Sequence, residues 1–141
     1  MTQSLPGSIE ALAAHARSIS GVKYAPDYPP DNIGVFPFSV IYIENGQIMA
    51  EAADQSRNIV RVIVEIHVSR VLLATAIETA TGYIETYGDL LVNDPTLGGA
   101  CAAIPMGISE NITFEMGWLA WGGTPSFGVR FHVPVKIRRA V

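Results

Sequence analysis

The sequence has very little cysteine, few charges and no long apolar run, and each of these shortages excludes a class of protein. Cys101 is the single cysteine, so no internal disulfide can form, and we expect the chain to be made and used in a reducing compartment. Every apolar stretch is interrupted within a few residues by Arg, Glu, Gly or Pro, well short of the roughly 20 residues that a membrane-spanning helix needs. No basic-then-apolar leader opens the sequence, so we expect neither a secretory signal nor a membrane partner.

The shortage of charge also limits the partners of the chain. Charged residues make up 16 % of the 141 residues, and hydrophobic residues make up 49 %. This composition excludes intrinsic disorder and leaves an unusually uncharged surface, which indicates contacts with other subunits. With 9 Lys and Arg against 13 Asp and Glu, the formal net charge is -4, which argues against a nucleic-acid-binding groove as the main function. The length predicts a single domain spanning residues 1–141.

Hydrophobic periodicity predicts the element order α-β-β-α-β-β-β. The first helix is expected from about Ser8 to Ser20, with Ser8 as its N-cap and Glu10 in its first turn. The other predicted elements are strands at about 36–44 and 58–69, a helix at about 69–91, a strand at about 100–106, and two closing strands within 112–118 and 127–137. The sum is an α+β fold with a mostly antiparallel sheet of about five strands and two helices packed on one face.

Turn residues predict how the strands are connected. Asn45-Gly46 is typical of a tight turn, because both residue types tolerate positive φ. Residues 47–57 are either a short strand followed by a mobile loop or an extended hairpin arm, so that an arm or loop is expected around 44–58. Gly122-Gly123 predicts the hairpin loop between the closing strands.

Few residues form a pattern that predicts chemistry. Cys101 lies in an apolar stretch, which favours a buried small side chain over a reactive thiol. Glu65 and His67 share one strand face and, with His132, could form a metal site, but Arg61 on that face favours an ordinary ion-pairing surface. The sequence shows no nucleophile elbow, phosphate loop or carboxylate pair with catalytic spacing. We therefore expect no enzyme, no catalytic residue, no metal and no cofactor.

Two tryptophans near the end of a predicted strand point to opposite faces. Trp118 shares an apolar face with Phe114 and Met116, which predicts a position in the core. Trp121 falls on the other face at the tip of the predicted hairpin, where an exposed tryptophan is typical of a contact residue. Trp121 is therefore a candidate residue of a subunit or tube interface.

Two charged groups of opposite sign form the remaining candidates. The last strand ends in a basic cluster of Lys136, Arg138 and Arg139. This cluster is either a solvated edge that blocks unwanted strand pairing or a pairing surface for an acidic neighbour. The predicted arm carries three acidic residues, Glu44, Glu51 and Asp54. If the chain forms a ring, these residues are candidates to face its channel; the equal alternative is a solvated loop.

The order of elements and three segments resemble a known family. These segments are Tyr28-Pro29-Pro30 after the first helix, Asn93-Asp94-Pro95-Thr96-Leu97-Gly98-Gly99 after the second helix, and 128–135 in the last strand. Over nearly the whole chain, this pattern resembles the tail terminator (tail completion) proteins of long-tailed bacteriophages and prophages, the family typified by the lambda tail terminator.

The resemblance implies a structural protein of the virion, assembled in the host bacterial cytoplasm and located at the head-proximal end of the tail. It implies a homohexameric ring that caps the tail tube, ends its polymerisation and meets the head–tail connector or neck protein. It also implies that DNA passes through the ring without specific binding. A basic lumen would bind the DNA phosphates and hold the DNA, whereas an acidic lumen would let it slide. The alternatives are a head-side neck or stopper ring protein and a small dimeric α+β enzyme or ligand-binding domain.

Overall fold

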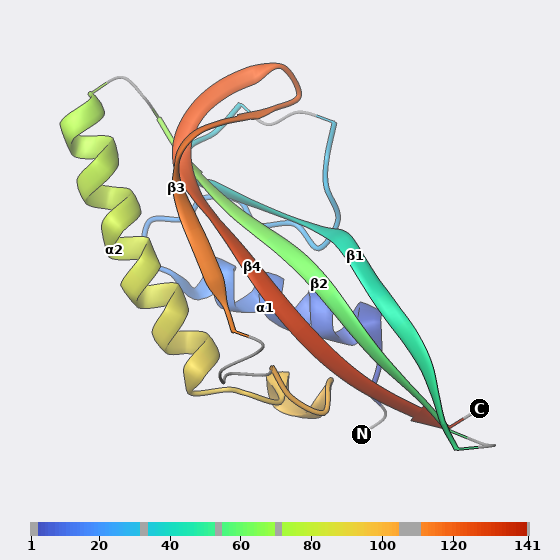
Figure 1. Cartoon of the computed structure of the whole chain (residues 1–141). Coiled ribbons are helices and arrows are strands. Elements are labelled where there is room, and N and C mark those ends of the chain that lie inside the picture. The colour runs from blue at the N-terminus through green and yellow to red at the C-terminus, as the bar shows by residue number, and fades with distance from the viewer. Residues whose placement is uncertain (1–2, 32–33, 53–54, 70–71, 105–110, 141) are drawn as a thin grey trace.

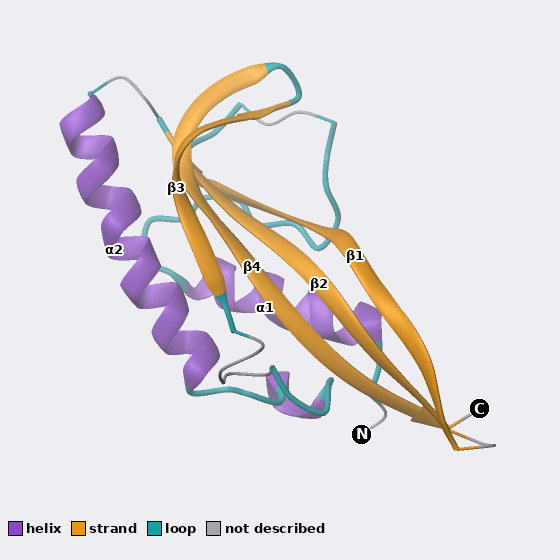
Figure 2. Cartoon of the chain, viewed as in Figure 1, coloured by secondary structure: helices purple, strands orange, loops and turns teal. Residues whose placement is uncertain are grey.

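The structure is a computed structural model that describes residues 3–31, 34–52, 55–69, 72–104 and 111–140. The described part contains two α-helices, one short 3-10 helix and four strands (Figures 1 and 2). In chain order they are α1 (Leu5–Ser18), β1 (Phe38–Ala52), β2 (Gln55–Val68), α2 (Leu73–Val92), η1 (Leu97–Gly99), β3 (Thr113–Trp121) and β4 (Thr124–Ala140). The strands form one antiparallel sheet in the order β1-β2-β4-β3.

Both helices pack on one face of this sheet, as predicted. Alternate residues of β2, from Val60 to Val68, and of β4, from Phe127 to Ile137, are buried in one core with the apolar faces of α1 and α2. The Tyr87 hydroxyl in α2 donates a 3.0 Å hydrogen bond to the carbonyl of Leu12 and so joins the two helices. The α+β class and the period-two pattern of β2 and β4 are confirmed.

The first helix begins earlier than predicted. Ser4, not Ser8, is its N-cap, since the Ser4 hydroxyl accepts a 3.1 Å hydrogen bond from the backbone N–H of Gly7. Ser8 is buried inside the helix, and its hydroxyl donates to the Ser4 carbonyl at 2.8 Å. Pro6 in the first turn explains the earlier start, because proline is preorganised for this position and needs no N–H partner there. Glu10 consequently lies outside the first turn.

The second helix buries a slightly different face from the one predicted. Ala80, Tyr87 and Leu91 are buried as expected, but Leu73 and Ile77 remain 46 % and 39 % exposed. The helix starts at Leu73 rather than near Ser69. No helix in the described ranges is both long and apolar enough to cross a membrane.

The predicted turn at Asn45-Gly46 is wrong. Strand β1 continues through both residues to Ala52, and the sheet accommodates them with a β-bulge between Ile43 and Asn45. Glycine is required at position 46 because a Cβ atom there would lie 2.7 Å from the carbonyl oxygen of Ile59. Of the two alternatives for the following segment, the extended hairpin arm is the one that forms.

The predicted strand at 100–106 is also wrong as far as the structure describes it. The segment after η1 forms turns and a single isolated bridge between Ala103 and Lys136, and residues 105–106 lie outside the described residues. Its backbone donors have mixed partners: the N–H of Ile104 binds the carbonyl of Pro95 at 2.7 Å, and the N–H of Ala102 binds the carbonyl of Lys136 at 2.8 Å. The described sheet therefore has four strands instead of about five.

The β3–β4 hairpin curls over the face of the sheet that the helices leave open (Figure 1). Its turn is at Gly122-Gly123, where both residues have positive φ, 57° and 80°, so the predicted hairpin loop is confirmed. Within the hairpin, Gly117 of β3 pairs with Gly128 of β4. A Cβ atom on Gly128 would lie 2.1 Å from the carbonyl oxygen of Ile66 in β2. Only glycine therefore permits this close approach of β4 to β2.

Candidate functional site

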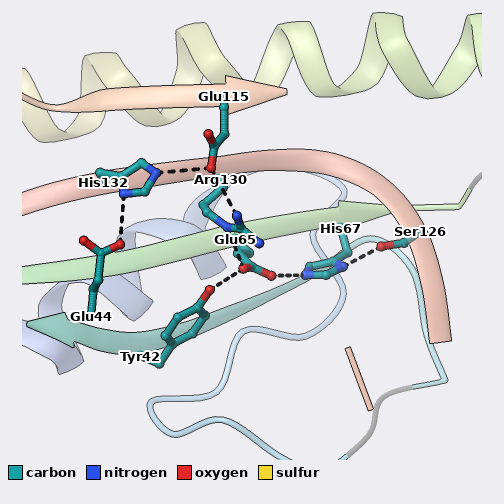
Figure 3. A network of polar contacts seen from close by, with 8 residues as sticks. All are labelled: Tyr42, Glu44, Glu65, His67, Glu115, Ser126, Arg130 and His132. Atoms are coloured by element: carbon teal, nitrogen blue, oxygen red, sulfur yellow. Dashed lines mark hydrogen bonds and ion pairs between the residues drawn. The ribbon is translucent and has the colours of Figure 1, made fainter. Parts of the chain in front are cut away.

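A polar network lies on the sheet face opposite the helices (Figure 3), and its Glu65, His67 and Ser126 are buried. It consists of Tyr42 in β1, Glu65 and His67 in β2, and Ser126 and Arg130 in β4. The His67 ring is held on both nitrogens, with Nδ1 2.6 Å from the Ser126 hydroxyl and Nε2 2.7 Å from Glu65 Oε1. Glu65 Oε2 accepts hydrogen bonds from the Tyr42 hydroxyl at 2.5 Å and from Arg130 Nε at 2.9 Å.

The network keeps Glu65 ionised in the interior. Burial by itself would raise the pKa of this carboxyl, but hydrogen bonds from His67, Tyr42 and Arg130 outweigh burial and hold the pKa below its usual value. Burial, followed by the hydrogen bond to Glu65, raises the pKa of Tyr42, so its hydroxyl stays protonated and donates. An ionised Glu65 also requires the hydrogen of His67 on Nε2, which leaves Nδ1 to pair with Ser126.

The network continues to the surface through charged side chains. Arg130 reaches Glu115 in β3 at 3.1 Å, and Glu115 lies 3.3 Å from His132 Nε2. The other ring nitrogen of His132 lies 3.5 Å from Glu44 at the β1 bulge. Hydrogen bonds from His132 and Arg130 lower the pKa of Glu115.

These pairings show how Glu65, His67 and His132 are arranged. His132 binds Glu44 and Glu115 and does not join Glu65 and His67. The described residues contain no group of three or more His, Cys, Asp or Glu side chains arranged to hold a metal ion. Glu65 ion-pairs with His67 and Arg130, so ion pairs form here, but Glu65 and His67 are buried, and the predicted ion-pairing surface is wrong for these two residues.

Ser126, His67 and Glu65 have the residue types and order of a hydrolase triad, but their side chains are not accessible to a substrate. In such a triad the carboxylate orients the histidine and the histidine activates the serine for attack on a carbonyl carbon. Here Ser126 and Glu65 are each 1 % exposed and His67 is 0 % exposed. No substrate carbonyl can reach the serine in this conformation, so the arrangement acts as a clamp between β2 and the curled part of β4.

Trp121 is not the exposed tip that the sequence predicts. Its indole N–H donates a 2.7 Å hydrogen bond to the carbonyl of Pro30, and its ring stacks on Tyr42 with centroids 5.7 Å apart. Trp121 also packs against a small second core of Phe38 and Val40. The curl of the hairpin causes the difference, because it folds the tip back onto the sheet.

The opposite face of β3 was predicted to be buried and is instead exposed. Phe114, Met116 and Trp118 were expected in the core, yet they are 54 %, 41 % and 61 % exposed. They lie on the helix side of an edge strand that α2 does not cover fully. Together with Ile77 of α2 they make an exposed apolar surface.

The basic candidates lie at one end of the sheet. Lys136, Arg138 and Arg139 in β4 pair in register with Ile59, Arg57 and Ser56 of β2, in the same part of the sheet as the far end of β1. Lys136 is half-buried, and Arg138 and Arg139 are exposed. Antiparallel pairing places this end of β4 beside the end of the β1–β2 hairpin.

The acidic candidates are placed only in part. Glu44 lies at the bulge, exposed and paired with His132. Glu51 belongs to β1, but its side chain lies outside the described part, and Asp54 lies outside the described residues altogether.

Cys101 is buried as predicted, and burial raises the pKa of its thiol to about 11.

Sequence reasoning missed Tyr42, Ser126 and Arg130. The signal was present in the alternation of strands, because these residues occupy the face of β1 and β4 opposite to the main core. What the sequence could not indicate was the curl that buries this face at one end. In comparisons with known proteins, no family model and no curated sequence matches the chain.

Proposed function

We propose that the chain is a structural virion protein of a long-tailed phage or prophage. In this proposal six subunits form a ring that caps the tail tube, ends its polymerisation and provides the surface for head–tail joining. Its partners are its own copies, the tail tube protein and the head–tail connector or neck protein, and DNA passes through the ring without specific binding. The chain assembles in the host cytoplasm and performs no catalysis.

One observation carries this proposal beyond the resemblance of the sequence. The subunit exposes two different surfaces at separate places, an apolar one along α2 and β3 and a charged one at the end of the β1–β2 arm. A ring with cyclic symmetry needs such a pair, because each subunit binds its neighbour through two unlike surfaces. The sealed polar network supports the same proposal, since it stabilises the subunit and offers no accessible reactive group.

Two alternatives make different predictions. A head-side neck ring uses similar surfaces but is found on the head portal. A hydrolase is favoured only by the Ser126–His67–Glu65 order, and it requires the hairpin to open.

The decisive experiment combines native mass measurement with electron microscopy of purified tail tubes mixed with the protein. We expect a six-fold ring at one end of each tube and tubes that no longer grow when free tube protein is added. Protein bound only to portal-containing heads would favour the neck ring instead. Tubes that neither bind the protein nor stop growing would contradict the proposal, and labelling of Ser126 by an acylating or phosphonylating serine probe would favour the hydrolase.

A further inference from the structure

The exposed apolar surface includes a groove between α2 and β3. Its walls are formed by Ile84 and Val92 of α2 and by Ile112 and Phe114 at the start of β3, and its volume is about 640 Å³. Val92 and Phe114 are 57 % and 54 % exposed. β3 is an edge strand of the described sheet.

The groove has a single sign of charge. Helix α2 carries Glu78, Glu85 and Asp89 and contains no Lys, Arg or His. Glu85 and Asp89 are exposed and line the groove, one turn apart on the helix. Like charges at this spacing weaken a helix slightly, so the groove is suited to an occupant that brings a cation together with an apolar side chain.

Gly88 also lines the groove and is not explained by packing within the chain. A glycine inside a helix costs about 1 kcal/mol relative to alanine. A Cβ atom at Gly88 would meet nothing within 4 Å. The glycine therefore leaves space that this chain does not use.

The other end of the same molecule has the complementary chemistry. Ile48 in the arm is 82 % exposed, and Arg139 near the end of β4 is exposed as well. Asn58 of β2 pairs with both Ile48 and Ile137, so Ile48 lies on the same sheet face as Ile137. Arg139, two residues after Ile137, shares this face, so Ile48 and Arg139 lie on the same face of the arm end, on two strands that are separated by β2.

The arm end is incomplete in its hydrogen bonding. Arg57 Nε and Asn58 Oδ1 are covered and have no hydrogen-bond partner among the described residues. Figure 1 shows that the arm end projects past the helices and away from α2, so it cannot reach the groove of its own chain.

We propose that the arm end of one copy docks in the α2–β3 groove of the next copy. Ile48 enters the apolar part of the groove, and Arg139 lies beside Glu85 and Asp89. Arg139 is opposite in charge to Glu85 and Asp89, and the two surfaces lie apart in one chain, so the occupant that we propose is a second copy in a head-to-tail contact. This inference rests on the proposed function only in that repeated contacts close into a ring. The contact between two copies is tested with the purified protein, without tail tubes.

The test exchanges the charges of the two surfaces. Arg139→Glu in the arm end and Glu85→Lys with Asp89→Lys in the groove are each expected to weaken self-association about tenfold or more in sedimentation velocity. An equimolar mixture of the two variants restores association, because each acidic surface then meets a basic one. Lys23→Glu and Glu10→Lys are matched controls on exposed positions elsewhere and leave association unchanged.

A disulfide trap tests the contact when association is weak. Mixed Ile48→Cys and Val92→Cys chains are expected to form a disulfide dimer on oxidation, whereas neither variant alone does. Folding of every variant is verified by circular dichroism.

The outcomes separate the contact from the proposed function. A chain that stays monomeric at high concentration and gives no trapped dimer overturns the contact, and so does association that the charge changes leave untouched. Capture by an unrelated acidic or basic partner instead of a second copy also overturns it. If six-fold rings still cap tails when both charge variants assemble normally, the contact is wrong and the proposed function stands. If the mixture rescues association but no tail is capped, the contact stands and the proposed function fails.

Discussion

Glu65 brings a negative charge into the sheet, and its environment makes that charge stabilising. Three hydrogen-bond donors surround its two oxygens, and one of them, Arg130, supplies a positive charge that remains partly in solvent. The residue therefore connects three strands through one carboxylate. Removing this carboxylate leaves a buried histidine and a tyrosine hydroxyl without their acceptor, which is more costly than losing an exposed ion pair.

The folded protein is expected to lose stability in acid through Glu65. Its pKa in the folded state is lower than the ordinary value of 4.5, so its contribution is complete above that pH and is lost as pH falls through the lowered folded value. Glu65→Gln should lower the free energy of unfolding by about 3 kcal/mol at pH 7 and should make its fall below pH 4.5 shallower. Urea unfolding at a series of pH values measures both effects.

Glu115→Gln is the matched control for this prediction. Glu115 also has a lowered pKa, but its side chain is 58 % exposed, and exposed ion pairs contribute about 1 kcal/mol or less. A Glu65→Gln protein as stable as the wild type at pH 7, with the same acid slope, would contradict the role given to the network.

The two tryptophans are expected to have the opposite roles to those predicted from the sequence, with Trp121 stabilising the fold and Trp118 exposed. Trp121→Ala removes a half-buried ring that stacks on Tyr42 and binds Pro30, so it should destabilise the fold by about 3 kcal/mol. Trp118→Ala removes a ring that is 61 % exposed and should change stability by about 0.5 kcal/mol or less. Thermal and urea unfolding compare the two, and an assembly assay shows whether Trp118 is the contact residue. Equal stability losses in both variants would be inconsistent with the curl.

At the scale of elements, the curled β3–β4 hairpin decides which residues are buried. It covers Phe38, His67 and Ser126 on the face that the helices leave open. The curl depends on close approach of β4 to β2 at Gly128, which is a property of backbone packing and not of hydrophobic pattern.

Gly128→Ala is accordingly expected to open or distort the hairpin. The added methyl group would collide with the Ile66 carbonyl oxygen at 2.1 Å, and we expect a loss of about 2 to 4 kcal/mol in the free energy of unfolding. Near-ultraviolet circular dichroism should report the changed environment of Trp121. Gly117→Ala, at the partner position with nothing within 4 Å of its Cβ, is the control and should be tolerated. A Gly128→Ala protein with unchanged stability would show that the close approach is not required.

The sequence predicts those elements whose signal is local. The alternation from Val60 to Val68 identifies β2 because every second residue meets the helices. Asn45-Gly46 misleads because a long partner strand, β2, extends beside it and makes a bulge more favourable than a turn. The face opposite the helices carries Tyr42 and Arg130 in the same alternation, but its burial depends on a tertiary bend that no short window of sequence contains.

At the scale of the whole molecule, antiparallel pairing gathers both charge signs at the arm. The basic end of β4 lies beside the end of the β1–β2 hairpin, to which Glu51 belongs. In the proposed ring the basic end meets the adjacent subunit and the acidic segment faces the channel. The sequence could predict the two charge groups but not their proximity, because register follows from pairing across the sheet.

Charge reversal of the acidic segment tests this placement. The double change Glu51→Lys and Asp54→Lys should permit ring assembly but impair DNA delivery, because a basic lumen binds phosphates with a strength set by the number of charges. Ring assembly is measured by native mass, and delivery is measured by the infectivity of particles that carry the variant. Glu10→Lys, an exposed change on α1, is the control. Full infectivity of the double variant, or a ring structure with these residues on its outer rim, would remove the basis for an acidic channel.

The β1 bulge at Ile43 and Asn45 has a further consequence for solubility during synthesis. An edge strand as long as Phe38–Ala52 would offer foreign strands a regular row of unpaired backbone groups and could seed fibrillar aggregates. The bulge breaks the spacing of that row near its middle, and the bridge from Tyr24 to Phe38 covers its beginning. Only short regular stretches of the edge are left, which lowers the tendency of β1 to pair with strands of other chains.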